Sequence, residues 1–261
     1  MKALYIASSG MAAQERNVEV ISNNIANMRT TGYKKARAEF QDLLYQAYRQ
    51  AGSTTSESGT MAPVAIEIGS GVRTAATPRI MSQGTPELTE KELDLAVRGE
   101  GFFVVQMPDG RTGYTRDGSF ERGPDGQLVT VDGYAVQPGI TIPGNANQVQ
   151  VSADGVVEVY LDNATTPTQV GQLQLARFVN KAGLASAGNN LFVETASSGP
   201  AQVGAPTTDG IGDLLQGYLE ASNVNSVTEI ADLIAAQRAY EMNARVISGA
   251  DEMMQSTTQL R

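Results

Sequence analysis

The stretch Met1–Met28, MKALYIASSGMAAQERNVEVISNNIANM, decides the fold together with a matching stretch near the other end of the chain, Ser226–Gln259. In the first stretch apolar side chains recur at steps of three and four residues, interrupted at Gln14, and the second repeats this spacing with interruptions at Gln237 and Asp251. This pattern is typical of amphipathic helices, whose apolar faces are buried against each other or against neighbouring molecules. We therefore predict a long helix at each end of the chain, the two pairing as a coiled coil.

The apolar residues of the two stripes are the predicted helix-packing set, through which the chain associates with itself. The set consists of Leu4, Met11, Val18, Ile21, Ile25, Met28, Ile230, Leu233, Ile234, Tyr240, Ile247 and Met254. The remaining faces of the first helix carry Ala, Ser, Asn and Gln more often than charged residues, which favours contacts with several neighbours over a solvated surface. The alternative is that the same stripes only hold a hairpin of two helices together within one molecule.

Capping residues predict where these helices begin and end. The first helix is expected to stop between Asn27 and Gly32, because Asn and Gly readily adopt the left-handed conformation that ends helices. The second is expected to begin at Ser226, where Ser226 and Glu229 have the spacing of a capping box. Gly249 costs its helix about 1 kcal/mol relative to alanine, which predicts a bend or closely packed surroundings there.

The middle of the chain has the pattern of a β domain. From Gly99 to Pro138, short apolar runs of period two are separated by Asp-Gly pairs, which predicts a meander of strands and tight turns. Further strands are expected at 149–151, 156–161, 173–179 and 191–194. Ahead of this region, 33–49 is expected to be a short helix or an extended segment, and 51–60, rich in Gly, Ser and Thr, a flexible connector.

The predicted fold class is therefore α+β, with N- and C-terminal helices that pair as a coiled coil and a mostly antiparallel β domain inserted between them. The chain is expected to divide into a first helix at 1–33, a connector with an extended loop at 34–75, the β domain at 76–221 and the second helix at 222–261.

The composition argues against most enzymatic and nucleic-acid-binding functions. The net charge is −9, whereas binding to nucleic acid or to anionic lipid needs clustered Lys and Arg. The sequence has no His, Cys or Trp, so imidazole and thiolate nucleophiles and most zinc ligands are missing. No segment is long and apolar enough to cross a bilayer, so direct membrane insertion is not expected. We predict no enzyme activity, and no catalytic, cofactor-binding or metal-binding residues.

Three short motifs could indicate a ligand-binding site, but each is better explained by its structural role. The Asp-Gly pairs could suggest calcium, but they lack the alternating carboxylates and closing Glu of an EF-hand and are better explained as turns. Gly99-Glu100-Gly101 precedes a predicted strand and lacks the third glycine of a nucleotide loop. Tyr114 and Arg116 share a strand face that could bind a ligand, yet such alternation more often marks a solvated face or a subunit contact.

The N-terminus superficially resembles a secretion signal, with Lys2 before a semi-apolar run that ends at Ala13. Ser8, Ser9 and Gly10 interrupt that run, and the helical stripe continues past Ala13 to Met28. We therefore expect the segment to be retained in the mature protein.

Three groups of residues resemble signatures of the bacterial flagellar rod and hook proteins. At the N-terminal side they are Asn23, Asn24 and Asn27, followed by Gly32 and Tyr33; in the middle they are Gly101-Phe102-Phe103 and Tyr114 to Phe120; at the C-terminal side they are Asn223 and Asn225, followed by Gln237, Arg238 and Tyr240. They occur in the family's order and span nearly the whole chain. The length and the Gly/Ser/Thr-rich connector fit a distal rod subunit better than a proximal rod subunit, and the chain has no room for the further outer domain of a hook protein.

The resemblance implies a structural subunit of the distal rod, a straight, stiff tube that transmits torque across the cell envelope to the hook. It implies that the terminal helices line the tube and that the β domain lies outside them. It further implies that the connector around Ala47 to Met61 wedges between subunits and favours a straight, stiff rod over a bendable hook. The implied partners are other copies of the chain, other rod proteins, the hook protein, the surrounding ring proteins and the flagellar export apparatus, which would export the chain without signal cleavage to the periplasm-spanning rod of the basal body.

Two other classes of function remain open from the residues alone. A secreted binding module would use the β domain for a ligand and keep its helices as an intramolecular hairpin. An acid-catalysed hydrolase would require two carboxylates that converge in a cleft, and the sequence indicates no particular pair.

Overall fold

The computed structural model describes residues 2–53, 61–161 and 166–259 and divides the chain into two compact units. The helical unit consists of Met1–Ile25, Ala36–Pro78 and Asn225–Arg261, and the β unit consists of Ala26–Lys35 and Arg79–Val224. Most of the connector predicted at 51–60 lies outside the described residues.

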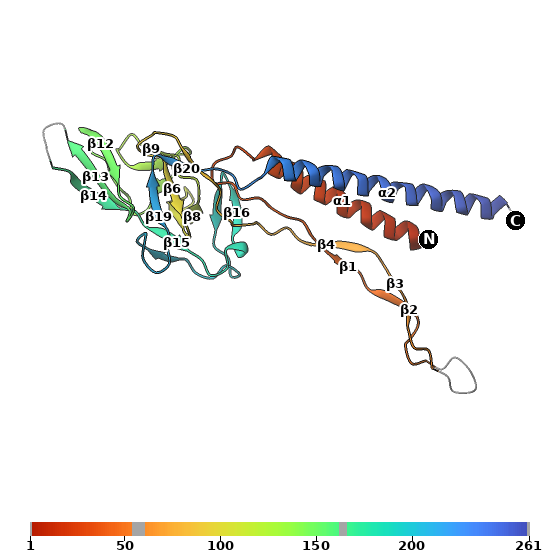
Figure 1. Ribbon diagram of the computed structural model, residues 1–261. Helices are drawn as coiled ribbons and strands as arrows, with labels where there is room; N and C mark the ends of the chain where they lie inside the picture. The colour runs from red at the N-terminus through yellow and green to blue at the C-terminus, as the bar shows by residue number, and fades with distance from the viewer. Residues whose placement is uncertain (1, 54–60, 162–165, 260–261) are drawn as a thin grey trace. The chain divides into compact units, whose positions relative to one another are not determined.

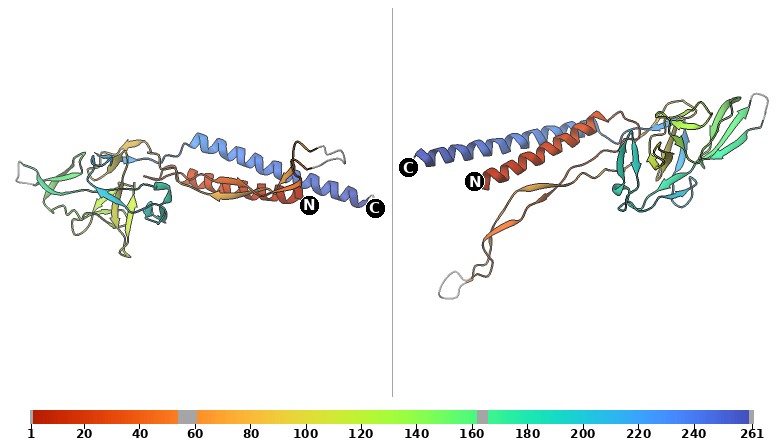
Figure 2. Two further views of the ribbon diagram at one scale, coloured as in Figure 1. Left: turned by 90° about the horizontal axis from the view of Figure 1, so that it is seen from below. Right: turned by 180° about the vertical axis from the view of Figure 1, so that it is seen from behind.

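Two long helices, α1 (Lys2–Ala26) and α2 (Ser226–Gln259), lie side by side and antiparallel in the helical unit (Figures 1 and 2). After α1 the chain turns, with the Thr30 N–H donating to the Asn27 carbonyl and Gly32 in the left-handed region at φ +67°. This is the stop expected from the sequence. The predicted fold class is confirmed, because the two helices are in contact and a mostly antiparallel β region separates them in the sequence.

The cap of α2 differs from the predicted one by a residue. Asn225, not Ser226, holds the capping position: its Oδ1 accepts hydrogen bonds from the N–H groups of Val227 and Thr228, at 3.1 and 3.2 Å. Asn and Ser are both strong capping residues, so the sequence alone does not decide which of the neighbours Asn225 and Ser226 caps α2. The prediction of close packing around Gly249 was also wrong, since a Cβ atom added there would meet nothing within 4 Å.

The segment after α1 is extended, which settles the choice left open by the sequence. It forms a long β-hairpin in which β1 (Glu39–Asp42) pairs antiparallel with β4 (Val72–Ala76), and β2 (Tyr45–Arg49) with β3 (Ile66–Gly69). The two arms meet at the base of the hairpin, where the Arg37 N–H donates to the Pro78 carbonyl at 3.0 Å.

The β unit contains the remaining described strands. They are β5 (Pro86–Leu88), β6 (Leu95–Arg98), β7 (Phe102–Gln106), β8 (Thr112–Thr115), β9 (Phe120–Arg122), β10 (Leu128–Thr130), β11 (Ala135–Val136), β12 (Ala146–Val151), β13 (Val156–Leu161), β14 (Thr168–Gln172), β15 (Leu175–Arg177), β16 (Ala185–Gly188), β17 (Leu191–Val193), β18 (Gln202–Gly204), β19 (Asp213–Gln216) and β20 (Tyr218–Glu220), with a 3₁₀ turn η1 (Lys181–Gly183). Their largest sheet follows the order β16-β17-β8-β7-β11-β10-β9, with β15 also on β7 and β18 on β15. Three further groups are β12-β13-β14, β19-β6 and β20-β5.

Strand β7 is central to the core because both of its faces are buried. Phe103 and Val105 pack into the larger apolar cluster, which extends through the strands around β13 and β15. Phe102 and Val104 point the other way, into a smaller cluster that holds Tyr114. A strand covered on both faces reads as a continuous apolar run, which is the FFVV pattern of the sequence.

The expectation that Tyr114 and Arg116 lie on a solvated face is wrong. Tyr114 is buried, and its ring meets Phe178 edge-on with centroids 4.8 Å apart. Arg116 is also buried, with its guanidinium 5.2 Å from the centre of the Phe102 ring. The alternation along β8 therefore reflects a sheet covered on both sides.

Candidate functional site

The two helices meet along a seam of small side chains. The buried helix residues include Ala7, Ala13, Ala236 and Ala250. At Gly10 a Cβ atom would lie 2.9 Å from Nδ2 of Asn243, so α2 passes close to this glycine. Small residues at a helix interface allow the backbones to approach closely and leave the larger side chains for other surfaces.

The predicted helix-packing set is divided between the seam and the exposed surface. Ile21 is buried, and the half-buried members are Leu4, Met11, Val18, Ile25, Leu233 and Ile247. The exposed members are Met28, Ile230, Ile234, Tyr240 and Met254. The predicted packing set left out the small residues of the seam, such as Gly10 and Ala13, because it was chosen from large apolar residues.

A buried polar contact joins the ends of the helices that lie nearest the chain turn. Asn24 Nδ2 donates to Oε2 of Glu229 at 3.1 Å and to the Ala36 carbonyl at 2.9 Å, while Asn24 Oδ1 accepts from the Ala36 N–H at 3.0 Å. Asn24 and Glu229 are both buried. One side chain of the N-terminal signature thus holds the first turn of α2 and the start of the hairpin arm.

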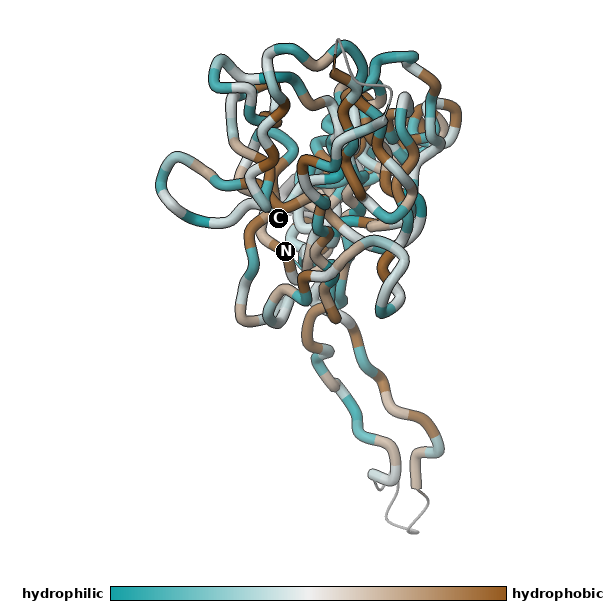
Figure 3. The backbone as a smooth tube through the Cα atoms, turned by 90° about the vertical axis from the view of Figure 1, so that its left-hand side faces the viewer, coloured by the Kyte–Doolittle hydropathy of each residue, from teal (hydrophilic) through white to brown (hydrophobic). Residues whose placement is uncertain are grey.

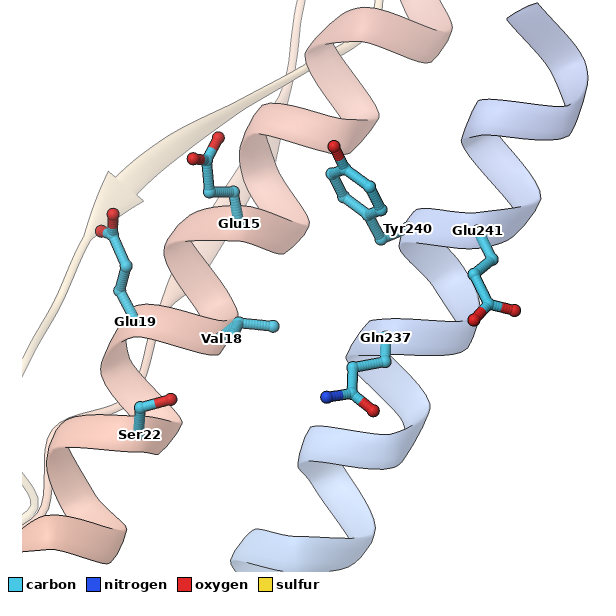
Figure 4. Close-up of a pocket in the computed structure, with 7 residues that line it drawn as sticks. All are labelled: Glu15, Val18, Glu19, Ser22, Gln237, Tyr240 and Glu241. Atoms are coloured by element: carbon cyan, nitrogen blue, oxygen red, sulfur yellow. The ribbon is translucent and has the colours of Figure 1, made fainter. Parts of the chain in front are cut away.

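A groove with a volume of about 590 Å³ runs along one flank of the helix pair (Figure 4). Val18 points from α1 toward α2, and Gln237 and Tyr240 point from α2 toward α1. Glu15 and Glu19 on α1 and Glu241 on α2 flank it, and Ser22 completes its lining. The signature residues Gln237 and Tyr240 therefore lie on an open surface of the unit.

The middle of the hairpin, where β4 begins, is fixed to α1. Ser9 Oγ donates to the Ile6 carbonyl at 2.7 Å and accepts from the Val72 N–H at 3.3 Å. Gly71 has φ +118°, and a Cβ there would lie 2.3 Å from Ser9 Oγ, so only glycine fits this approach. Further along, Lys2 Nζ donates to the Tyr48 hydroxyl at 3.0 Å.

Hydrophobic residues recur along both arms of the hairpin (Figure 3). Large apolar side chains in its outer part are exposed. They are Leu44, Tyr45, Tyr48, Met61, Val64, Ile66 and Ile68, of which Leu44 is 88% exposed. A two-stranded hairpin is at best marginally stable alone in water, and apolar residues on both of its faces are typical of a surface that another molecule covers.

The β unit contains a buried ion cluster that joins three of its segments. Lys34 Nζ lies 2.5 Å from Oε1 of Glu220, and Arg116 Nη1 lies 3.1 Å from Oε2 of Glu220. The side chains are 1%, 3% and 0% exposed, for Lys34, Arg116 and Glu220 respectively. Burial lowers the pKa of the Lys34 ammonium and of the Arg116 guanidinium, and the Glu220 carboxylate opposes this effect in both.

Neutral groups complete the cluster. Lys34 Nζ donates to the Ser82 carbonyl at 2.8 Å, Arg116 Nη2 donates to the Gly99 carbonyl at 2.6 Å, and Glu220 Oε1 accepts from the Gly84 N–H at 2.8 Å. Every charged atom but Arg116 Nε has a partner in the described residues. The cluster joins three segments of the β unit through buried, hydrogen-bonded charges.

The other signature residues of the β unit surround this cluster. A Cβ on Gly32 would lie 2.7 Å from the Arg116 carbonyl carbon, which explains the glycine. Tyr33 is buried, with the Arg79 guanidinium 5.7 Å from the centre of its ring. Asn223 Oδ1 accepts from the Lys35 N–H at 2.8 Å, and its Nδ2 donates to the Ile80 carbonyl at 2.7 Å. Asn27 lies in the turn after α1 and accepts from the Thr30 hydroxyl.

The two remaining signature residues lie on the helices. Asn23 and Arg238 are both exposed side chains on the helices, at α1 and α2 respectively. Within the described residues, no cluster of three or more acidic side chains could hold a metal ion. No described helix is long and apolar enough to span a membrane.

The chain matches three protein-family models. They are the flagella basal body rod protein model at residues 4–34, the flagellar hook protein FlgE/F/G D1 domain at 96–159, and the flagellar basal body rod FlgEFG protein C-terminal at 215–260. These ranges cover most of α1, the buried strands around β7, and all of α2.

Curated proteins are similar over the full length. The flagellar basal-body rod protein FlgG of Caulobacter vibrioides is 56% identical over 261 residues, which is 100% of both chains. The FlgG protein of Agrobacterium fabrum is 50% identical over 97% of both chains. That of Bacillus subtilis is 35% identical over 100% of this chain and 99% of its own.

Proposed function

The chain belongs to the family of flagellar basal-body rod proteins, and from this we propose that it is a structural subunit of the flagellar distal rod. Its copies polymerise into a straight, stiff tube that transmits torque to the hook. The role is mechanical, so the molecule needs surfaces for its neighbours in place of a catalytic centre.

The observation that supports polymerisation is the exposure of large apolar side chains on the helical unit. Small residues form the seam inside the helix pair, whereas Ile230, Ile234 and Met242 of α2 face outward. Each such side chain gains roughly 1.5–3 kcal/mol when it is fully buried, so contacts between copies are favourable. The self-assembly set of the sequence analysis is therefore proposed to act between molecules as well as within one.

The hairpin provides a second surface for neighbouring copies. We assign to its outer part, around Ala47 to Met61, the stiffening role that the family resemblance implies. Its apolar side chains on both faces support this assignment, because they require cover that the described part of the hairpin does not supply.

The proposed partners and location follow from the family. Beyond its own copies, the subunit contacts the other rod proteins, the hook protein and the surrounding ring proteins of the basal body. We propose that the flagellar export apparatus delivers it to the periplasm-spanning rod with its N-terminal helix retained, since α1 is a packing element in the folded chain.

The test removes the helices without cutting into the β unit. A variant lacking residues 1–25 and 225–261 retains both segments of that unit and its ion cluster. We expect the intact chain to form tubes, seen by electron microscopy and light scattering, while the trimmed chain stays a folded monomer. If both stay monomeric at every concentration, polymerisation is wrong and a ligand-binding role for the β unit takes its place.

A further inference from the structure

The hairpin that follows α1 consists of two halves, which meet at a break in its ladder. The inner half pairs β1 with β4, the outer half pairs β2 with β3, and residues 43–44 and 70–71 link the halves. The Leu43 N–H donates to the Gly71 carbonyl at 2.8 Å, so the two arms stay bonded to each other at the break. The outer half extends away from the helices (Figure 1). Its direction therefore depends on what holds the break.

The first turns of α1 hold the hairpin at this break. Ser9 Oγ donates to the Ile6 carbonyl at 2.7 Å and accepts from the Val72 N–H at 3.3 Å, so one hydroxyl joins the hairpin to the helix backbone. A Cβ atom on Gly71 would overlap Ser9 Oγ and lie 3.2 Å from Ser9 Cβ. The hairpin backbone thus lies directly against the helix, at a separation that requires glycine.

Burial does little to hold the outer half in place. All of β2 and the first three residues of β3 are exposed. Lys2 Nζ, near the start of α1, donates to the Tyr48 hydroxyl at 3.0 Å and lies 4.9 Å from the centre of the Tyr48 ring. Both side chains are exposed, and contacts between exposed groups contribute little. The close approach of Gly71 to Ser9 is the stronger of these two restraints.

We infer that Ser9 and Gly71 are positioning residues, which fix the direction in which the outer half of the hairpin leaves α1. The inference rests on the proposed self-assembly, in which this outer half meets a neighbouring copy. Ile66 of β3 lies five residues from Gly71, which is about 17 Å along an extended strand. A change of about 20° at the break would displace Ile66 by about 6 Å, more than the roughly 4.5 Å within which apolar side chains are in contact.

The stiffness of the tube then depends on a contact inside each subunit as well as on contacts between subunits. A surface that is already held in its bound direction loses less conformational freedom when a neighbour covers it. A hairpin that pivots at the break could follow a neighbour as the tube bends, whereas a fixed hairpin resists that movement. Ser9 and Gly71 therefore contribute to stiffness without touching the neighbouring copy.

The test measures the direction of the outer half in the full-length chain. The sequence contains no Cys, so Arg16→Cys with Glu67→Cys places spin labels at two defined, exposed positions of α1 and β3. Electron paramagnetic resonance gives the distribution of distances between them, at a concentration below that of assembly. We expect this distribution to become about twofold broader in Gly71→Ala, because the added Cβ separates the hairpin from Ser9.

Ser9→Gly combined with Gly71→Ala tests the contact itself. The double variant removes both Ser9 atoms that the new Cβ would meet, and the next atom, Ile6 Cα, is 3.6 Å away. The distance distribution should therefore narrow again, although residue 71 keeps the same backbone strain in both variants. Gly69→Ala, in the same arm, is the matched control. Its Cβ would meet the Tyr45 ring at 3.4 Å, an ordinary contact, and the distribution should not change. Circular dichroism checks that the helices remain folded.

Electron microscopy of the assembled tubes is the second readout. Gly71→Ala should form tubes about twofold more curved than those of the unmodified chain, although every apolar side chain of the hairpin is retained, and the double variant should recover straightness. The inference is overturned if the distance distribution of Gly71→Ala is unchanged, or if the double variant recovers neither property. Straight tubes from a Gly71→Ala chain with a broadened distribution also overturn it. If the unmodified chain forms no tubes, the proposed function fails, whereas the distances still decide whether Ser9 positions the hairpin.

Discussion

At the scale of single residues, Glu220 has the largest predicted effect on stability. It is the carboxylate shared by Lys34 and Arg116 in the ion cluster, and all three side chains are buried. Glu220→Gln leaves two buried cations without a counter-charge, so we expect the β unit to lose about 3–5 kcal/mol of unfolding free energy. Urea unfolding followed by circular dichroism measures this loss.

Glu121→Gln is the matched control for this change. Glu121 is an exposed residue of β9, and its substitution should alter the unfolding free energy by no more than about 0.5 kcal/mol. Equal effects of the two variants would show that the cluster contributes no more than a surface charge.

Asp213 gives the chain a pH-dependent contact. It forms an ion pair with Arg98, and the hydrogen bond from that guanidinium holds the pKa of the Asp213 carboxyl below its usual 3.8. A carboxylate with a lowered pKa stabilises the folded state above its unfolded pKa, and that contribution is lost as the pH falls through the folded value. We expect Asp213→Asn to be less stable than the unmodified chain at pH 6 and to approach its stability below about pH 3.8.

Urea unfolding at a series of pH values checks this expectation. Asp125→Asn, at an exposed turn residue, should leave the difference between neutral and acidic pH unchanged. A gap between Asp213→Asn and the unmodified chain that persists undiminished in acid would mean that the ion pair is not its cause.

The residue types of the sequence alone could not indicate these roles. Arg116 follows directly after β8, where the sequence has the alternation of a half-exposed sheet, and its burial depends on Glu220, more than a hundred positions later. Asn24 and Asn223 belong to recognisable signatures, yet their hydrogen bonds to Ala36 and Lys35 are tertiary contacts that no local periodicity encodes.

At the scale of elements, the two helix glycines should respond oppositely to one substitution. Gly10→Leu places a side chain against Asn243, whose nearest atom is 2.9 Å from the added Cβ, whereas Gly249→Leu meets nothing within 4 Å at that position. We expect Gly249→Leu to raise helix stability by about 0.8 kcal/mol through helix propensity. Gly10→Leu should lower it, because the overpacked seam costs typically 1–3 kcal/mol.

Thermal melts of the helical signal by circular dichroism compare the two variants directly. The chemical change is the same in both, so propensity cancels between them and the remaining difference reports the seam. If Gly10→Leu melts at the same temperature as Gly249→Leu, the helices do not approach closely at Gly10.

Helical periodicity predicted the elements better than it predicted their interface. Steps of three and four residues are a local property, and they located α1 and α2 closely. Which part of an apolar stripe faces the partner helix depends on the distance between the axes, which small residues such as Ala13 and Ala236 determine. The hairpin after α1 was ambiguous for a related reason, since its short apolar runs fit a helix or a strand.

At the scale of the whole molecule, the hairpin can be tested separately from the helices. Its two arms meet where the Arg37 N–H donates to the Pro78 carbonyl, so replacing residues 39–76 by two glycines joins chain ends that are already close. The helix seam and the β unit retain their own contacts, while the apolar arms that we assign to neighbouring copies are removed.

We expect this excised chain to assemble but to form tubes that bend more readily, because a stiff tube requires contacts that resist sliding between neighbouring subunits. Electron microscopy measures the curvature of the tubes. The double variant Ile66→Thr with Ile68→Thr tests the apolar surface of the hairpin while the hairpin itself stays in place. Thr retains strand propensity but removes exposed apolar area from β3. A partial increase in tube curvature in this variant assigns the stiffness to the apolar contacts of the hairpin. If the excised chain forms tubes as straight as those of the unmodified chain, the stiffness comes from the helices alone.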